Sequence, residues 1–66
     1  MSQINVYTER YTVEVDHKVV ARSGNITEAA DKFRKVRDQH KRDQIPALVG
    51  VFDNLDDKWV EVVTVK

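Results

Sequence analysis

The stretch Trp59-Val60-Glu61-Val62-Val63-Thr64-Val65 decides the fold of this 66-residue chain, because it predicts a β-strand that is apolar on both faces. Successive side chains of a strand point to opposite faces. Alternation therefore puts one apolar set on the first face, Trp59, Val63 and Val65, and another on the second, Val60 and Val62. A single helix covers only one face of a sheet. The face with Val60 and Val62 is thus expected to contact a second subunit or a partner protein.

Three other segments predict the strands that accompany this one. Tyr11–Val15 alternates apolar and polar residues, which is typical of a strand with one solvated face. Asp16 and His17, with or without Lys18, form a turn that leads into a second strand over residues 19–22. Residues 47–52 are almost continuously apolar and predict a third strand, and the polar turn at residues 53–57 connects it to the last strand, over residues 58–65.

The segment between the two hairpins predicts a helix over Ile26–Arg42. Asn25 or Thr27 can cap its start, and Pro46 disfavours helical geometry in the residue before it. Its apolar side falls within one arc of about 120° on a helical wheel, which contains Ile26, Ala29, Ala30, Phe33, Val36 and His40. The predicted fold is α+β with the order ββαββ: an antiparallel four-stranded sheet with a single helix packed on one face, as one domain over residues 1–66.

The amino-acid composition indicates the cellular compartment in which the protein is expected. The chain has no cysteine, whereas small secreted domains usually depend on disulfides, so we expect a cytoplasmic protein. Residues 1–5 lack the basic and apolar regions of a signal peptide, and no apolar run approaches the roughly 20 residues that cross a bilayer. We expect no membrane association. Residues 1–3 are expected to be flexible and residues 4–7 extended, with a bend at residues 8–10.

Charge is balanced overall but unevenly distributed. The chain has 11 basic and 11 acidic residues, and the basic ones concentrate in the helix. On its outer face, acids four residues before bases are expected to pair with half of that basic charge: Glu28/Lys32, Asp31/Lys35 and Asp38/Arg42. Arg34, Arg37 and Lys41 remain as one stripe. This stripe is either a plain solvated face, a contact for an acidic protein partner, or a contact for nucleic-acid phosphates.

The polar turn before the last strand is a second candidate contact. Asp56 and Asp57 form an acidic knob beside Trp59, whose ring either packs on the sheet or anchors a partner. The turn lacks the alternating ligands and glycine of a calcium loop. His40 is expected to be a hydrogen-bonded residue at the core or its rim, and His17 to be exposed, with no metal-binding spacing between them.

Signals for catalysis are missing from the sequence. It contains neither a cysteine nucleophile nor a glycine-rich loop, and Asp56 and Asp57 are neighbours in a turn rather than carboxylates held across a cleft. We therefore expect a protein that is not an enzyme, with no catalytic residues, no metal and no cofactor.

Tyr11–Val15, followed by Thr27-Glu28-Ala29-Ala30 and then a strand, resembles the small bacteriophage proteins that bind and inhibit host enzymes. The resemblance is one of size and strand–helix–strand pattern, and it assigns no role to any residue. It implies a modulator of a host protein.

The function expected from these features is that of a small protein-binding module, a modulator or inhibitor of a cellular host protein. The candidate partner-binding residues are Arg34, Arg37, Lys41, Asp56, Asp57 and Trp59. The chain is expected to be a homodimer with Val60 and Val62 at the subunit interface. Two alternatives remain: a nucleic-acid-binding protein that uses the basic stripe, and a structural subunit that only self-assembles.

Overall fold

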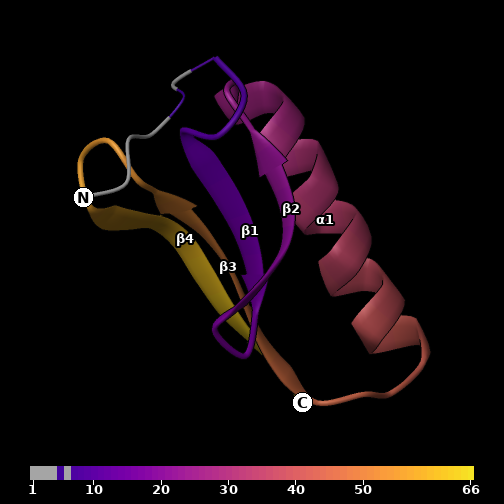
Figure 1. Ribbon diagram of the computed structural model, residues 1–66. Helices are drawn as coiled ribbons and strands as arrows, with labels where there is room; N and C mark the ends of the chain where they lie inside the picture. Colours follow the sequence, from indigo (N-terminus) through magenta and orange to yellow (C-terminus); the bar gives the residue numbers. More distant parts are fainter. Residues whose placement is uncertain (1–4, 6) are drawn as a thin grey trace.

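A computed structural model describes Asn5 and residues 7–66 of the chain (Figure 1). Its elements are β1 (Tyr11–Val15), β2 (Lys18–Ser23), α1 (Ile26–Arg42), β3 (Ala47–Asp53) and β4 (Lys58–Val65). The predicted order ββαββ is confirmed, as are the bounds of the helix and of the last strand. A turn over residues 7–9 runs into a bend at Arg10, as expected, but Tyr7 lies in this turn and is not extended. The predictions for residues 1–4 and 6 fall outside the described residues.

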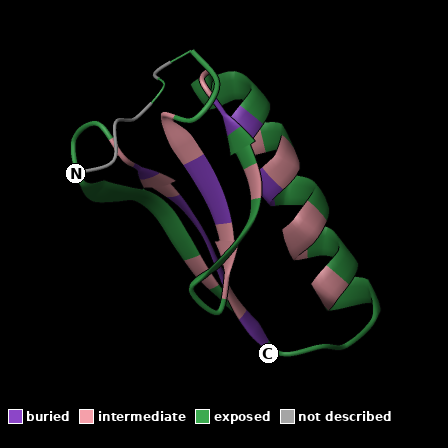
Figure 2. Ribbon diagram, viewed as in Figure 1, coloured by how far each residue is buried: buried purple, intermediate pink, exposed green. Residues whose placement is uncertain are grey.

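The four strands form one antiparallel sheet in the order β2-β1-β3-β4. Helix α1 lies along one face of this sheet, over β1, β2 and β3, and makes its fewest contacts with β4 (Figure 1). The opposite sheet face, called the outer face below, has no helix of the described residues on it. Figure 2 accordingly shows β4 exposed over most of its length, whereas β1 and β3 are mostly buried or half-buried.

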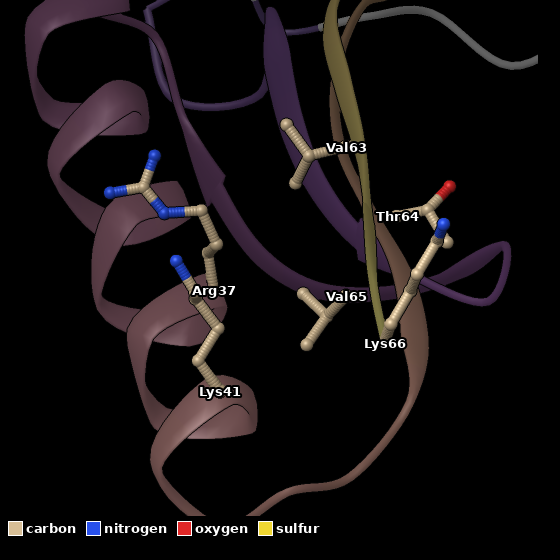
Figure 3. A pocket seen from close by; sticks show the side chains of 6 residues that line it. All are labelled: Arg37, Lys41, Val63, Thr64, Val65 and Lys66. Carbon is tan, nitrogen blue, oxygen red and sulfur yellow. The ribbon is translucent and has the colours of Figure 1, made fainter.

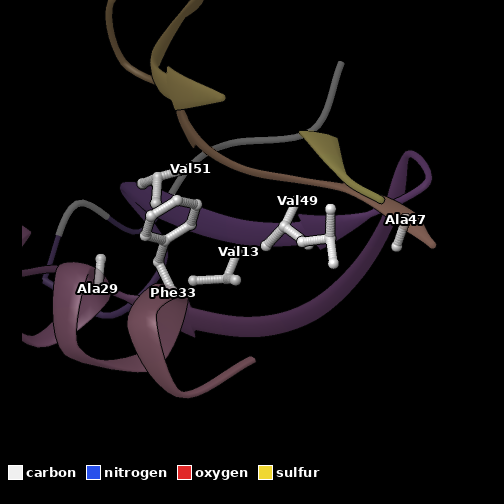
Figure 4. Packing of buried hydrophobic residues seen from close by; sticks show 7 residues of the cluster. Val13, Ala29, Phe33, Ala47, Val49 and Val51 are labelled. Atoms are coloured by element: carbon white, nitrogen blue, oxygen red, sulfur yellow. The ribbon is translucent and has the colours of Figure 1, made fainter. Parts of the chain in front are cut away.

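The hydrophobic core lies between α1 and the sheet (Figure 4). Phe33 of α1 inserts between the valines of the central strands, and Val13 and Val49 are almost completely buried. The buried apolar residues are Val13, Ala29, Phe33, Ala47, Val49, Val51 and Val65. Of the predicted helical arc, Ala29 and Phe33 reach the core, whereas Ile26 at the first turn remains 41% exposed.

The β1–β2 turn has the two-residue form that the sequence predicts. Asp16 and His17 both have positive φ, 51° and 70°, as a type I′ hairpin turn requires. The carboxylate of Asp16 accepts a hydrogen bond from the backbone N–H of Leu48 at 2.9 Å, which ties the turn to β3.

A β-bulge interrupts the pairing of β3 with β4. Val51 lies opposite Glu61, but the next residue, Phe52, lies opposite Trp59, so Val60 is an extra residue in β4. Opposite residues of an antiparallel pair share a face, and Trp59 therefore lies on the outer face with Phe52. The prediction that Trp59 shares a face with Val63 and Val65 is wrong, because the bulge breaks the alternation on which it was based.

Candidate protein-binding surfaces

The outer face carries a cluster of exposed apolar side chains on β4. Trp59 is 40% exposed, Val60 47% and Val62 43%. Val62 lies opposite Gly50 on the outer face, and Val60 is the bulge residue, without a partner in β3. We call Trp59 and Val62, with the exposed bulge residue Val60 between them in the sequence, the Trp59 patch. The expectation that one helix leaves a second apolar face of β4 uncovered therefore holds for the described residues, although that face also carries Trp59.

Contacts within the sheet hold the Trp59 ring in place. The ring lies over Gly50, and a β-carbon there would stand 2.9 Å from the indole carbon Cζ3. The Phe52 ring meets it edge-on, with 5.1 Å between centroids, and the His17 ring lies 6.3 Å away. An aromatic ring that is fixed in its free state loses little conformational entropy on binding, which is a property of interface anchors.

Asp53 organises the acidic turn beside the patch. Its buried carboxylate accepts hydrogen bonds from the Arg10 guanidinium at 3.2 and 3.1 Å and from the backbone N–H groups of Leu55 and Asp56. The hydrogen bond from Arg10, helped by those two N–H groups, lowers the pKa of Asp53 against the opposing effect of burial. Asp53 is thus a structural residue that shapes the turn.

The two predicted contact residues of this turn remain exposed. Asp56 lies 3.8 Å from Arg10 and 4.0 Å from Lys58, so nearby cations partly neutralise its charge. Asp57 has a positive φ of 56° and is exposed at the tip of the turn. Trp59 is the second residue of β4, so both acids lie in the turn that leads to the Trp59 patch.

The helix pairs its charges differently from the prediction. Glu28 and Lys32 form the expected ion pair at 3.2 Å. Asp31 pairs with Arg34 instead of Lys35, and Asp38 pairs with Arg37 instead of Arg42. Two residues of the predicted free stripe are therefore already neutralised, which the i,i+4 rule alone did not reveal. Lys41 forms no ion pair with any residue that the structure describes.

A groove of about 470 Å³ opens between α1 and β4, and no pattern in the sequence predicts it. Its lining residues are Arg37, Lys41, Val63, Thr64, Val65 and Lys66. Figure 3 shows the side chains of Val63 and Val65 pointing toward the helix, whereas those of Thr64 and Lys66 extend to the other side of the strand. The groove therefore has an apolar floor and a basic wall, made by Arg37 and Lys41. It exists because α1 lies over the other three strands.

The predicted contact residues thus separate into two surfaces on opposite faces of the sheet. Trp59 belongs to the outer face and follows the turn that contains Asp56 and Asp57, while Arg37 and Lys41 line the α1–β4 groove on the helix side. Arg34 belongs to neither surface. Of the two predicted interface residues, Val62 lies on the outer face with Trp59, and Val60 is the bulge residue that follows Trp59.

Among the described residues, neither histidine is part of a cluster that could hold a metal ion. His40 is half-buried at the rim of the core and its Nδ1 lies 3.3 Å from the carbonyl oxygen of Ile45, while His17 is exposed, both as expected. Across Asn5 and residues 7–66, no cluster of histidine, aspartate and glutamate has the geometry of a metal site. The single helix of these residues, α1, is too short and too polar to span a membrane.

Comparison of the chain with family models, with curated proteins and with solved structures finds no match.

Proposed function

We propose that this protein is a small, non-enzymatic, cytoplasmic protein-binding module that modulates or inhibits a cellular host protein by covering part of its surface. The observation that carries the proposal is the Trp59 ring, held over Gly50 on a sheet face without a helix, with Val60 and Val62 exposed beside it. Exposed apolar groups that cluster on one face of a small domain are typical of an interaction site.

The composition of the patch supports a protein as the partner. Its centre is aromatic and aliphatic, and the acids Asp56 and Asp57 lie in the turn that leads to it, which is compatible with the apolar centre and polar rim of a protein interface. Tryptophan is one of the side chains that are enriched at the energetic centre of such interfaces. The likeness in size and strand–helix–strand pattern to small bacteriophage inhibitors supports the modulator role, and the absence of cysteine supports the cytoplasm.

The alternative of nucleic-acid binding through the basic stripe has less support. Arg34 and Arg37 already pair with Asp31 and Asp38, so phosphate groups would have to compete with these carboxylates. The Trp59 ring contacts Gly50, Phe52 and His17, which offer a phosphate neither an arginine nor a lysine. A protein partner on the outer face needs no change in the described structure.

The experiment is an affinity capture from host lysate with tagged wild type and two variants, with and without nuclease. Val62→Lys puts a charge on the Trp59 patch. Ile45→Lys is the matched control, because Ile45 is also an exposed aliphatic residue, 49% against 43%, but lies in the loop after α1. Circular dichroism confirms that each variant is folded. We expect one dominant protein that survives nuclease, is retained by Ile45→Lys and is lost by Val62→Lys.

Three results would contradict this proposal. Equal capture by Val62→Lys and wild type would remove the outer face as the binding site. Capture that disappears with nuclease and weakens steeply with salt would indicate nucleic acid instead. Recovery of the protein alone would leave self-assembly as its function.

A further inference from the structure

Strand β4 lies at the edge of the sheet. Among the described residues β4 pairs with β3 alone, so its other edge presents unpaired backbone N–H and C=O groups. With 8 residues it is the longest strand of the sheet. After the bulge at Val60, residues 61–65 pair with β3 without irregularity. This regular segment is available for pairing with another strand.

The segment is self-complementary about its centre. When two copies of β4 lie antiparallel with the two-fold axis at Val63, each Val63 faces its counterpart and Glu61 of one copy faces Val65 of the other. This register keeps helix-side residues opposite helix-side residues, as sheet pairing requires. The regular segment of each copy pairs with the whole regular segment of the other.

The charges are complementary in the same register. Glu61 lies opposite Val51, which puts it on the helix side of the sheet, and it is exposed with no ion pair among the residues described. Val65 lines the groove next to Arg37 and Lys41. Directly opposed residues of two strands have Cβ atoms about 4.5–5.5 Å apart. Glu61 of a second copy, opposite Val65, therefore lies within reach of the basic wall.

We propose that a second copy of this chain is the occupant of the α1–β4 groove: two subunits pair through their β4 edges about Val63, and Glu61 of each enters the groove of the other beside Arg37 and Lys41. Each ion-pair contact occurs twice, as in any two-fold symmetric interface. The eight strands form one continuous sheet with both helices on the same side. The proposal goes beyond the function proposed above, because it concerns the edge and the groove rather than the outer face.

A different role for Glu61 makes the opposite prediction. Proteins also point charged side chains inward on edge strands to prevent the edge from pairing. If Glu61 served that purpose, its neutralisation would promote association. If Glu61 meets Lys41 of a second copy, its neutralisation weakens association. Glu61→Gln, which keeps the size of the side chain, separates these two roles.

The test is sedimentation equilibrium of the full chain at several concentrations and at low salt, for wild type, Glu61→Gln, Glu61→Lys, Lys41→Glu and the double variant Glu61→Lys/Lys41→Glu. We expect a dimer for wild type, weaker dimers for all three single variants, and a loss of at least about tenfold in affinity for Glu61→Lys. The double variant reverses both partners of the ion pair and is expected to restore much of the affinity. Lys18→Glu on β2, the other edge strand, is the matched control and should dimerise as wild type does.

A monomeric wild type over the whole concentration range would overturn the proposal. So would a tighter dimer for Glu61→Gln, or a double variant as weak as Glu61→Lys. Circular dichroism of each variant separates weak association from unfolding. The outcome is distinguishable from that of the capture experiment: a monomeric Glu61→Lys that still captures the host protein supports the outer-face function independently. A wild-type dimer that captures no host protein supports only the β4 pairing.

Discussion

The indole ring of Trp59 lies across Gly50 so closely that a β-carbon at position 50 would stand 2.9 Å from its Cζ3 and 3.1 Å from its Cε3. The carbonyl oxygen of Glu61 would lie at 3.0 Å. Non-bonded carbon atoms rest at about 3.5–4.0 Å. Only glycine therefore leaves room for the ring, and the missing side chain at position 50 determines where the aromatic part of the patch lies.

Gly50→Ala is expected to lower the free energy of unfolding by about 1–3 kcal/mol, because the added methyl overpacks the ring and the Glu61 carbonyl. Without that overlap, alanine would stabilise a strand interior by about 0.5–1 kcal/mol over glycine. Urea unfolding measures the stability, and the emission of Trp59, the only tryptophan, reports the ring. Unchanged stability and emission would contradict the packing described. In a Trp59→Ala background the penalty should shrink without vanishing, because the Glu61 carbonyl remains.

The first turn of α1 depends on Asn25. Its side-chain oxygen accepts hydrogen bonds from the backbone N–H groups of Thr27 at 2.7 Å and Glu28 at 3.4 Å. Asn25→Ala removes this acceptor and should destabilise the fold by about 0.5–2 kcal/mol. Asn25→Asp keeps an acceptor and serves as the control in the same thermal unfolding assay. Equal losses for both variants would rule out capping as the cause.

The β1–β2 turn can be improved at one residue. His17 has φ of 70°, in a region that costs a non-glycine residue roughly 1–2 kcal/mol. His17→Gly removes that cost, but glycine also loses more conformational entropy on folding. We therefore expect a net increase of about 0.5–1 kcal/mol in the free energy of unfolding. Asp16→Gly is the control. It relieves a similar φ but loses the hydrogen bond from Leu48, and it should not stabilise the fold. Destabilisation by His17→Gly would mean that the contact with Trp59 outweighs the strain.

The pair formed by Arg10 and Asp53 makes stability depend on acid pH. Because the pKa of Asp53 is lowered from its ordinary 3.8 in the folded state, the unfolded chain binds more protons just below that pH. The stabilisation is therefore present above about pH 4 and is lost as pH falls through the folded pKa. Asp53→Asn should be less stable than wild type at pH 7, and the difference should shrink below pH 4. A difference that is constant from pH 7 to pH 3 would contradict this linkage.

Regular patterns in the sequence were sufficient to predict the helix and the strands. The helix over Ile26–Arg42 is confirmed because its apolar period, its cap at Asn25 and the proline beyond its end all agree. The predicted face of Trp59 was wrong, because a β-bulge adds a residue to the strand and no local feature of the composition marks it. The position of the bulge depends on which residue of β3 lies opposite each residue of β4, and the whole sheet determines that register.

The surfaces were only partly predictable for a similar reason. The basic residues of the groove, Arg37 and Lys41, were identified from helical spacing alone. The groove itself depends on how far α1 reaches across the sheet, and no single segment contains that information. The pairing of Asp31 with Arg34 rather than Lys35 depends on competition between two neighbouring cations, which spacing rules do not resolve.

The bulge also gives the chain a spare residue in an unusual place. Losing one residue from the interior of a strand normally inverts every side chain beyond it. Loss of Val60 alone would instead leave Trp59 opposite Phe52 and Glu61 opposite Val51, the partners that they have now. A deletion at this position would shorten the polypeptide yet preserve its exposed indole, so β4 tolerates a change of length at its bulge.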